Sequence, residues 1–264
     1  MIYLALKEKM KMKEDNILKA RLIDLAKKAY QQNIYTYSSF LNPTELCILD
    51  DIRDEIKYID YEIFGGAEGN ERCMVGFGSE AMFGYEGVWP ISIICVAPIL
   101  DKFAEEMGHR DLLGALMNLG IERSVLGDII VKGKRAYIFV QDNMASYIME
   151  KLTKVRHTNV RCSLIDDGKA VDELKPAFED IECIVASPRF DAVIAALTKK
   201  SRSDVIGLFQ SQKVSLNGRI CERNSMVLKP EDVFSIRGYG KYIYVGEERE
   251  TRKGRLYTKV KKYV

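Results

Sequence analysis

The chain has 264 residues, of which 47% are hydrophobic and 30% are charged. This balance is typical of a globular protein with about one to three domains of roughly 100–200 residues each, and it argues against a disordered chain. The best candidate for a membrane span, residues 88–100, has 13 residues and two prolines, whereas a membrane helix needs about 20. The first residues lack the apolar stretch and cleavage site of a signal peptide. We therefore expect a cytoplasmic protein that has no membrane partner.

The formal net charge of +2 conceals an uneven distribution along the chain. Residues 185–264 contain 17 lysines and arginines against 8 aspartates and glutamates, whereas residues 1–184 contain 23 against 30. Such asymmetry indicates contact with nucleic acid, because a basic surface attracts phosphates. A solvated basic surface without a partner is the alternative.

The N-terminal region predicts a helical unit over residues 1–55. Residues 14–32 place apolar side chains, among them Ile17 and Leu22, on one helical stripe. The tetrapeptide at residues 42–45, Asn-Pro-Thr-Glu, begins a second helix with an apolar face. The glycine-rich residues 65–70 match neither a phosphate-binding loop nor a dinucleotide fingerprint, so they predict a hairpin loop.

The middle of the chain predicts a small α+β domain over residues 56–182. A strand is expected at residues 73–78 and another at 90–97, followed by a helix at 101–119 that ends at Gly120. A hairpin of two strands, 127–133 and 135–141, comes next. The last elements are a helix at 143–155, capped by Asn143, and a strand at 160–165. From residue 90 this order is β-α-β-β-α-β, the ferredoxin-like arrangement that RNA-recognition motifs share. Both helices then cover one face of the sheet, and we expect the other face to be free for binding.

Tyr137 and Phe139 occupy the third strand of this predicted unit. RNA-recognition motifs carry base-stacking aromatic residues at that place, and the run RAYIFV fits their pattern in part. The two-residue period of a strand puts both rings on one face. They are therefore candidates for secondary RNA stacking. The alternative is an aromatic pair buried against a helix or another domain.

The residues that catalysis or metal binding would need are sparse. The chain has two histidines, His109 and His157, without ligand partners at helical spacing, and its six cysteines form no closely spaced pair. For His109 a capping or surface role is favoured over catalysis, because no nucleophile motif accompanies it. We expect buried thiols, no catalytic residue, no metal and no cofactor.

The C-terminal region predicts two short helices and a set of strands. Pro188 suits the first turn of an apolar helix that ends at Lys199-Lys200, and Ser201 or Ser203 caps a second helix. A strand at 214–216 leads to Asn217-Gly218, a strong hairpin signal. Further strands are expected at residues 233–238, 242–246 and 255–260.

This region resembles the RNA-binding domain named after ribosomal small-subunit protein four, here called the S-four domain. The resemblance lies in PRFDAVIAALTKKSRSDVIGLFQSQKVSLNG, residues 188–218, and in KPEDVFSIRGYGKY, residues 229–242. Asp204, close to Arg202, and Val205, at a position where the family has a smaller residue, depart from the pattern. The resemblance implies an S-four-type domain over residues 183–264. Its implied RNA-binding residues are Arg189, Lys199, Lys200, Ser201, Arg202, Lys213, Asn217 and Arg219.

The whole chain resembles the YlmH-type S-four proteins of bacteria, through GHRDLLGALMNLGIERSVLGDI at residues 108–129, the Asn-Pro-Thr-Glu turn and the C-terminal module. The resemblance implies a non-enzymatic monomer that binds ribosomal RNA and tRNA on the large ribosomal subunit, in translation quality control, and that binds no DNA. Two alternatives stay open. One is an RNA-modifying enzyme with an S-four targeting module. The other is a protein-interaction module linked to cell division, with a protein partner on the N-terminal or middle domain.

Overall fold

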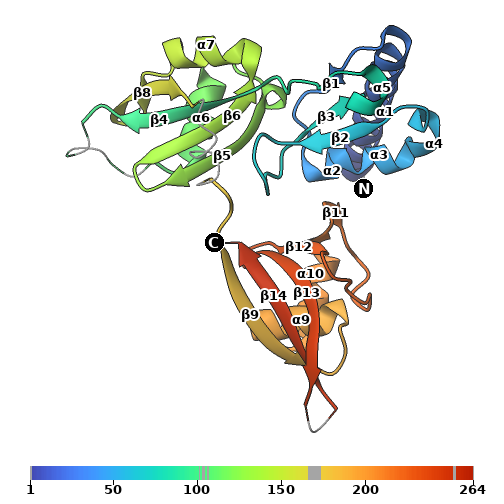
Figure 1. Ribbon diagram of the computed structural model, residues 1–264. Coiled ribbons are helices and arrows are strands. Elements are labelled where there is room, and N and C mark those ends of the chain that lie inside the picture. Colours follow the sequence, from blue (N-terminus) through green and yellow to red (C-terminus); the bar gives the residue numbers. More distant parts are fainter. Residues whose placement is uncertain are drawn as a thin grey trace. The chain divides into compact units, whose positions relative to one another are not determined.

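The computed structural model describes residues 2–100, 102, 105, 107–165, 174–251 and 254–263. The fold is α+β, with a long N-terminal helix and three antiparallel sheets (Figure 1). Contacts divide the chain into two compact units, residues 1–175 and 176–264. Within the described parts of the chain, no helix is long and apolar enough to cross a membrane.

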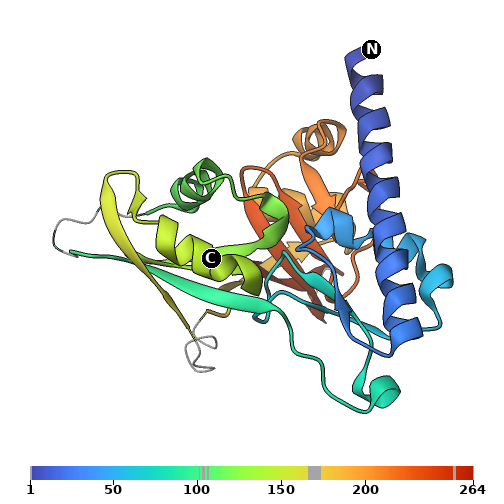
Figure 2. The same ribbon diagram turned by 90° about the horizontal axis from the view of Figure 1, so that it is seen from above.

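The first unit begins with α1 (Ile2–Gln32), which is one continuous helix (Figure 2). It is longer than the predicted helix, and its buried positions include Leu22, Ala26 and Ala29. The prediction for Ile17 is wrong, because this side chain is 59% exposed, whereas its neighbour Leu18 packs against the core. The predicted second helix is divided into three single turns: α2 (Pro43–Leu46), α3 (Ile48–Asp51) and α4 (Arg53–Ile56).

A three-stranded sheet completes the N-terminal part of this unit. Its order is β1-β3-β2, with β1 (Thr36–Tyr37), β2 (Tyr61–Phe64) and β3 (Met74–Phe77), and α5 (Glu80–Phe83) follows it. Because β2 and β3 pair antiparallel, the glycine-rich residues 65–70 lie in a hairpin loop, as predicted. Asn42 caps α2 through a complete capping box with Glu45, which explains why the helical turn begins there.

The middle part of the unit is a five-stranded sheet in the order β5-β6-β4-β8-β7. In chain order the elements are β4 (Ile91–Pro98), α6 (His109–Asn118), the 3-10 turn η2 (Arg123–Val125), β5 (Leu126–Lys132), β6 (Arg135–Gln141), α7 (Asp142–Lys151), β7 (Lys154–Val155) and β8 (Thr158–Leu164). The β-α-β-β-α-β order is therefore present, with β7 as an added edge strand.

Three helix boundaries in this part differ from the predictions. The helix α6 begins only at His109, with Gly108 as its N-cap; residues 101, 103, 104 and 106 of the predicted helix lie outside the described residues. The cap of α7 is Gln141 rather than Asn143. The chain leaves α7 after Lys151 because residues 154–155 pair with β8 as an edge strand.

The two faces of the middle sheet bury different partners. On one face Ile94, Ile138 and Val140 pack with residues of α6 and α7. On the other, Ile93 and Phe139 pack with residues of the N-terminal part, including Phe40, Ala67 and Met74. The expectation of a wholly free second face is therefore wrong. The N-terminal part covers one end of it, where the Phe139 ring is fully buried.

Arg72 joins the N-terminal and middle parts. Its Nε donates to the carbonyl of Leu126 at 2.8 Å, and its Nη2 donates to those of Phe40 and Arg123 at 3.0 Å each. Asp128 accepts the backbone N–H of Arg72 at 3.1 Å. Burial lowers the pKa of Arg72. The side chain thus ties together three segments that are distant in sequence.

The second unit is a six-stranded sheet with two helices on one face. The sheet order is β11-β10-β12-β13-β14-β9. The elements are β9 (Phe178–Val185), α9 (Phe190–Thr198), α10 (Arg202–Gln210), β10 (Val214–Leu216), β11 (Arg219–Ile220), β12 (Val233–Ile236), β13 (Gly240–Glu250) and β14 (Leu256–Tyr263).

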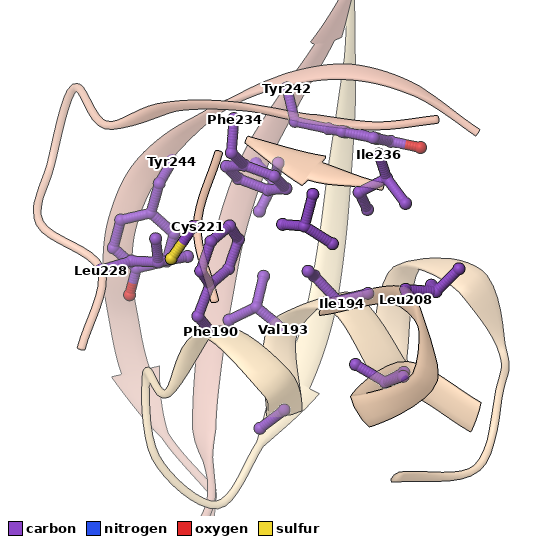
Figure 3. Packing of buried hydrophobic residues seen from close by; sticks show 14 of the residues in the cluster. Phe190, Val193, Ile194, Leu208, Cys221, Leu228, Phe234, Ile236, Tyr242 and Tyr244 are labelled. Carbon is purple, nitrogen blue, oxygen red and sulfur yellow. The ribbon is translucent and has the colours of Figure 1, made fainter. Parts of the chain in front are cut away.

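The core of this unit lies between the helices and the sheet. Phe190 and Val193 of α9 point toward Phe234 and Tyr244 of the sheet (Figure 3). The strand β9 was not predicted, and it pairs along its full length with β14. The predicted boundary between residues 182 and 183 therefore cuts through a strand, and the observed boundary lies after residue 175.

Candidate nucleic-acid interface

The joint between α9 and α10 carries four of the predicted RNA-binding residues in sequence. Lys199 ends α9 in the left-handed conformation, with φ at 55°, and Ser201 is the N-cap of α10. The side chains of Lys199, Lys200 and Arg202 are exposed, and none has an ion-pair partner among the described residues. The reversal of the chain between the two helices therefore gathers three cations at one point.

Ser201 and Asp204 complete the N-terminus of α10 between them. The Ser201 hydroxyl accepts the Asp204 N–H at 3.2 Å and donates to the Asp204 carboxylate at 2.7 Å. This hydrogen bond lowers the pKa of Asp204, and Lys200 lowers it further. The helix end that would otherwise attract a phosphate already holds a carboxylate. Ser201 therefore acts as a cap, and the cationic side chains beside it are left to contact an anion.

Arg189, the N-cap of α9, is held by its own helix. Its Nε and Nη2 donate to the two carboxylate oxygens of Asp191 at 3.1 and 2.9 Å. This pairing raises the pKa of Arg189. Asp191 is 3% exposed, so the arginine compensates a buried charge. Its guanidinium is thereby fixed in one orientation.

The two predicted residues of the hairpin have different surroundings. Asn217 and Gly218 both have positive φ, 47° and 79°, as the tight turn requires. The Asn217 amide donates to Asp232 at 2.8 Å and accepts the Val233 N–H at 2.9 Å. Asn217 therefore holds the turn against β12. Arg219, two residues on, has an exposed side chain.

Lys213 lies beside a cation that the sequence reasoning missed. The backbone N–H of Arg237 donates to the Lys213 carbonyl at 2.8 Å, and both residues line a shallow groove of about 410 Å³. Ser215 and Ser235 line the same groove, with their hydroxyl oxygens 2.6 Å apart. The position of Arg237, directly between a strand and a glycine-rich turn, is the sequence signal that could have identified it.

The structure separates the two aromatic candidates of the middle domain. Phe139 is fully buried, so it is not available to stack on a base, and this part of the stacking prediction is wrong. The ring is enclosed because Phe40, Ala67 and Met74 pack over it. Tyr137 is half-buried at the edge of the same cluster.

The uncovered end of this sheet face carries cations that the sequence reasoning also missed. Lys132 pairs with Arg135 across β5 and β6, and Ala97 pairs with Arg161 across β4 and β8. All three cationic side chains are exposed. Arg135 and Arg161 both act on the pKa of Cys95, which lies between them; burial raises this pKa and the two positive charges oppose the rise. Three cations therefore lie near the accessible edge of Tyr137.

The six cysteines form no disulfide bond; Cys73, Cys183 and Cys221 are buried, as expected, whereas the other three are only half-buried. Burial raises the pKa values of Cys162 and Cys183 to about 11, so both remain protonated at neutral pH. In the described portion of the structure, no group of three or more histidine, cysteine or acidic residues is arranged to hold a metal ion.

Comparisons with known proteins agree with the resemblance found in the sequence. Residues 94–167, from β4 to just beyond β8, match a family described as "Putative RNA-binding domain in YlmH". The chain is 28% identical over 219 residues to "Ribosome-associated protein quality control protein P2" of Bacillus subtilis, and the match covers 82% of each chain. A solved structure, "Cell division protein ylmH from Streptococcus pneumoniae", is similar at 19% identity and a TM-score of 0.47, covering 60% of this chain and 95% of that one. Residues 94–167 are thus similar to the putative RNA-binding domain of YlmH, and most of the chain is similar to the Bacillus protein.

Proposed function

We propose that this protein binds structured RNA, without catalysing a reaction, on the large ribosomal subunit in ribosome-associated quality control. The bound RNA is ribosomal RNA, tRNA or both. The observation that carries the proposal is the match of residues 94–167 to an RNA-binding family. The name of the Bacillus relative supports the ribosomal setting. This setting also supports a cytoplasmic location, and we propose that the protein acts as a monomer.

The proposal includes two domain assignments. We propose that residues 91–164, within the predicted range of 56–182, form a ferredoxin-like, RNA-recognition-motif-like domain, and the sheet order β5-β6-β4-β8 supports this. We propose that the second unit, residues 176–264, acts as an S-four-type domain, which extends the predicted range of 183–264 to include the whole of β9. Two short helices followed by the β10–β11 hairpin support the second assignment.

Two surfaces are proposed to contact the RNA. The C-terminal surface consists of exposed cations at the helix joint and the hairpin, namely Lys199, Lys200, Arg202, Lys213 and Arg219. The middle surface consists of Lys132, Arg135 and Arg161, with the edge of Tyr137 between them. One arginine guanidinium can donate two parallel hydrogen bonds to a phosphate group, and a lysine ammonium acts as a mobile point charge. Both kinds of contact suit folded RNA, which is recognised largely through its backbone and shape.

The remaining predicted residues are proposed to position these surfaces. Ser201 caps the helix that carries Arg202, and Asn217 fixes the turn that presents Arg219. Arg189, tied to Asp191, is proposed to contact RNA only through the N–H groups that this pairing leaves available. Discrimination against DNA is proposed to come from contacts to the 2′-hydroxyl.

Sedimentation with purified ribosomal subunits tests the proposal. The full chain is mixed with large or small subunits, and the bound fraction is measured in the pellet. We expect binding to large subunits, and we expect the variant Lys199→Ala/Lys200→Ala/Arg202→Ala to lose most of it because three phosphate contacts are removed at once.

A charge-matched variant distinguishes specific contact from general basicity. Arg21→Ala/Lys27→Ala/Lys28→Ala removes three exposed cations from α1, and we expect it to bind as the unmodified protein does. Equal binding to both subunits, or equal losses in the two triple variants, would contradict the proposal.

A further inference from the structure

The first unit contains an aromatic pocket that none of the proposed RNA contacts uses. It lies along the sheet β1-β3-β2 and has a volume of about 400 Å³. Thirteen described residues line it, of which five are aromatic, four are acidic and none is lysine or arginine. The aromatic residues are Tyr35, Tyr37, Tyr61, Phe64 and Trp89.

The rings stand around the pocket at close, fixed distances. The centroid of Trp89 lies 5.1 Å from that of Tyr37 and 5.4 Å from that of Phe64. The ring of Tyr35 lies 6.4 Å from Tyr37, with the two planes within 10° of parallel. The Tyr35 hydroxyl donates to the carbonyl of Tyr85 at 2.9 Å, which fixes that ring. The arrangement presents several π faces to one space.

Two glycines allow these rings to lie against the backbone. A Cβ atom at Gly76 would meet Trp89 at 2.8 Å and Tyr37 at 3.0 Å. A Cβ atom at Gly87 would meet Tyr35 at 2.6 Å. Any larger residue at either position would displace the rings. The wall of the pocket therefore depends on bare backbone at these two positions.

The carboxylates of the pocket are not neutralised within the described structure. Asp60 accepts a hydrogen bond from the Ser79 hydroxyl at 2.7 Å, whereas Glu62, Glu80 and Glu86 pair with no cation of the described residues. Burial raises the pKa of Tyr37, and the negative charge of Glu62 adds to the rise. The pocket thus combines aromatic faces with uncompensated negative charge.

We propose that this pocket binds a guanidinium or ammonium side chain from a basic segment of a partner protein. Aromatic faces attract cations through their quadrupole, and the carboxylates add direct attraction. The same carboxylates repel RNA phosphates, so the ligand chemistry is opposite to that of the C-terminal surface. The inference is independent of the proposed RNA binding, because it involves none of the same residues.

Trp89 makes the test direct, because it is the single tryptophan of the chain. The full chain is titrated with the peptide Gly-Arg-Gly-Arg-Gly while tryptophan fluorescence is recorded. We expect a saturable change with this peptide and none with Gly-Gln-Gly-Gln-Gly, which has the same length and no charge. The variant Glu62→Gln/Glu86→Gln should bind about fivefold more weakly.

The control is Glu55→Gln, which removes an exposed carboxylate from α4 and should bind as the unmodified protein does. Thermal unfolding followed by circular dichroism verifies that each variant is folded. The inference is overturned by any of three outcomes: no saturable change with the arginine peptide, equal responses to both peptides, or full affinity in the folded Glu62→Gln/Glu86→Gln variant. A saturable response to single-stranded oligouridine that the arginine peptide cannot displace would also overturn it, by identifying a nucleobase site.

Discussion

Replacement of Arg202 by alanine tests the C-terminal surface most directly. This surface has five exposed cations: Lys199, Lys200, Arg202, Lys213 and Arg219. Each phosphate that a cation neutralises releases counterions, and the logarithm of the binding constant falls with the logarithm of the salt concentration by about 0.7–0.9 per phosphate. Five contacts predict a slope of about −3.5 to −4.5, which is a loss of roughly 100- to 500-fold between 50 and 200 mM salt.

In the Arg202→Ala variant we expect the slope to become shallower by about 0.7–0.9, because one phosphate contact is lost. The residue is exposed at the first position of α10, so stability should change by less than about 0.5 kcal/mol. The assay is fluorescence anisotropy of a labelled RNA hairpin with the full chain at several salt concentrations, with urea unfolding of both proteins alongside.

Lys261→Ala is the matched control for this measurement. Lys261 belongs to the same unit, but its ammonium lies 5.8 Å from the centroid of the Phe178 ring. Its neighbour Val260 is buried in the core beneath the helices, so Lys261 projects from the opposite face of the sheet. A salt slope near zero refutes the electrostatic reasoning, and so does an equal change of slope in the two variants. A slope steeper than −4.5 would show that the middle surface contributes as well.

The other predictions concern the first unit and the thiols. Phe139→Ala should lower the free energy of unfolding, measured by urea titration, by about 3–5 kcal/mol, because the ring is fully buried. Tyr137→Ala should keep the fold and weaken RNA binding, measured by anisotropy. A Phe139→Ala protein of unchanged stability would contradict the burial of this ring. Arg72→Lys should cost about 3 kcal/mol, since an ammonium cannot reach the three carbonyls that the guanidinium bridges; a loss below about 1 kcal/mol would show that Arg72 does not join the two parts. Burial raises the pKa of Cys183 to about 11, so its reactive thiolate is scarce at pH 8. Mass spectrometry should therefore show slow alkylation of Cys183 by iodoacetamide that accelerates in urea. Rapid alkylation of the folded protein would disprove this burial.

Local signals in the sequence were sufficient for much of the secondary structure. The helix start at Asn42, the turn at Asn217-Gly218 and the hairpin of β5 and β6 each depend on neighbours within a few residues, and each is present as predicted. Boundaries failed where a distant partner decided them. The strand β9 exists because β14 pairs with it, and α7 ends early because residues 154–155 join β8.

In the candidate site, too, some features follow from the local sequence and others depend on residues that are distant in the chain. The sequence by itself determined which residues are cationic, and it identified the helix joint that carries Lys199, Lys200 and Arg202. Only the tertiary structure decided their surroundings. It buried Asp191, the carboxylate that pairs with Arg189, and it placed Arg237 beside Lys213.

The aromatic residues show the physical reason. The two-residue period of a strand determined that Tyr137 and Phe139 share one face, because that depends on backbone geometry alone. Whether this face meets water or protein depends on what packs over it, and Phe40, Ala67 and Met74 come from segments far away in the chain. Burial is a property of long-range contacts, so the sequence could identify the face and only the fold could determine what covers it.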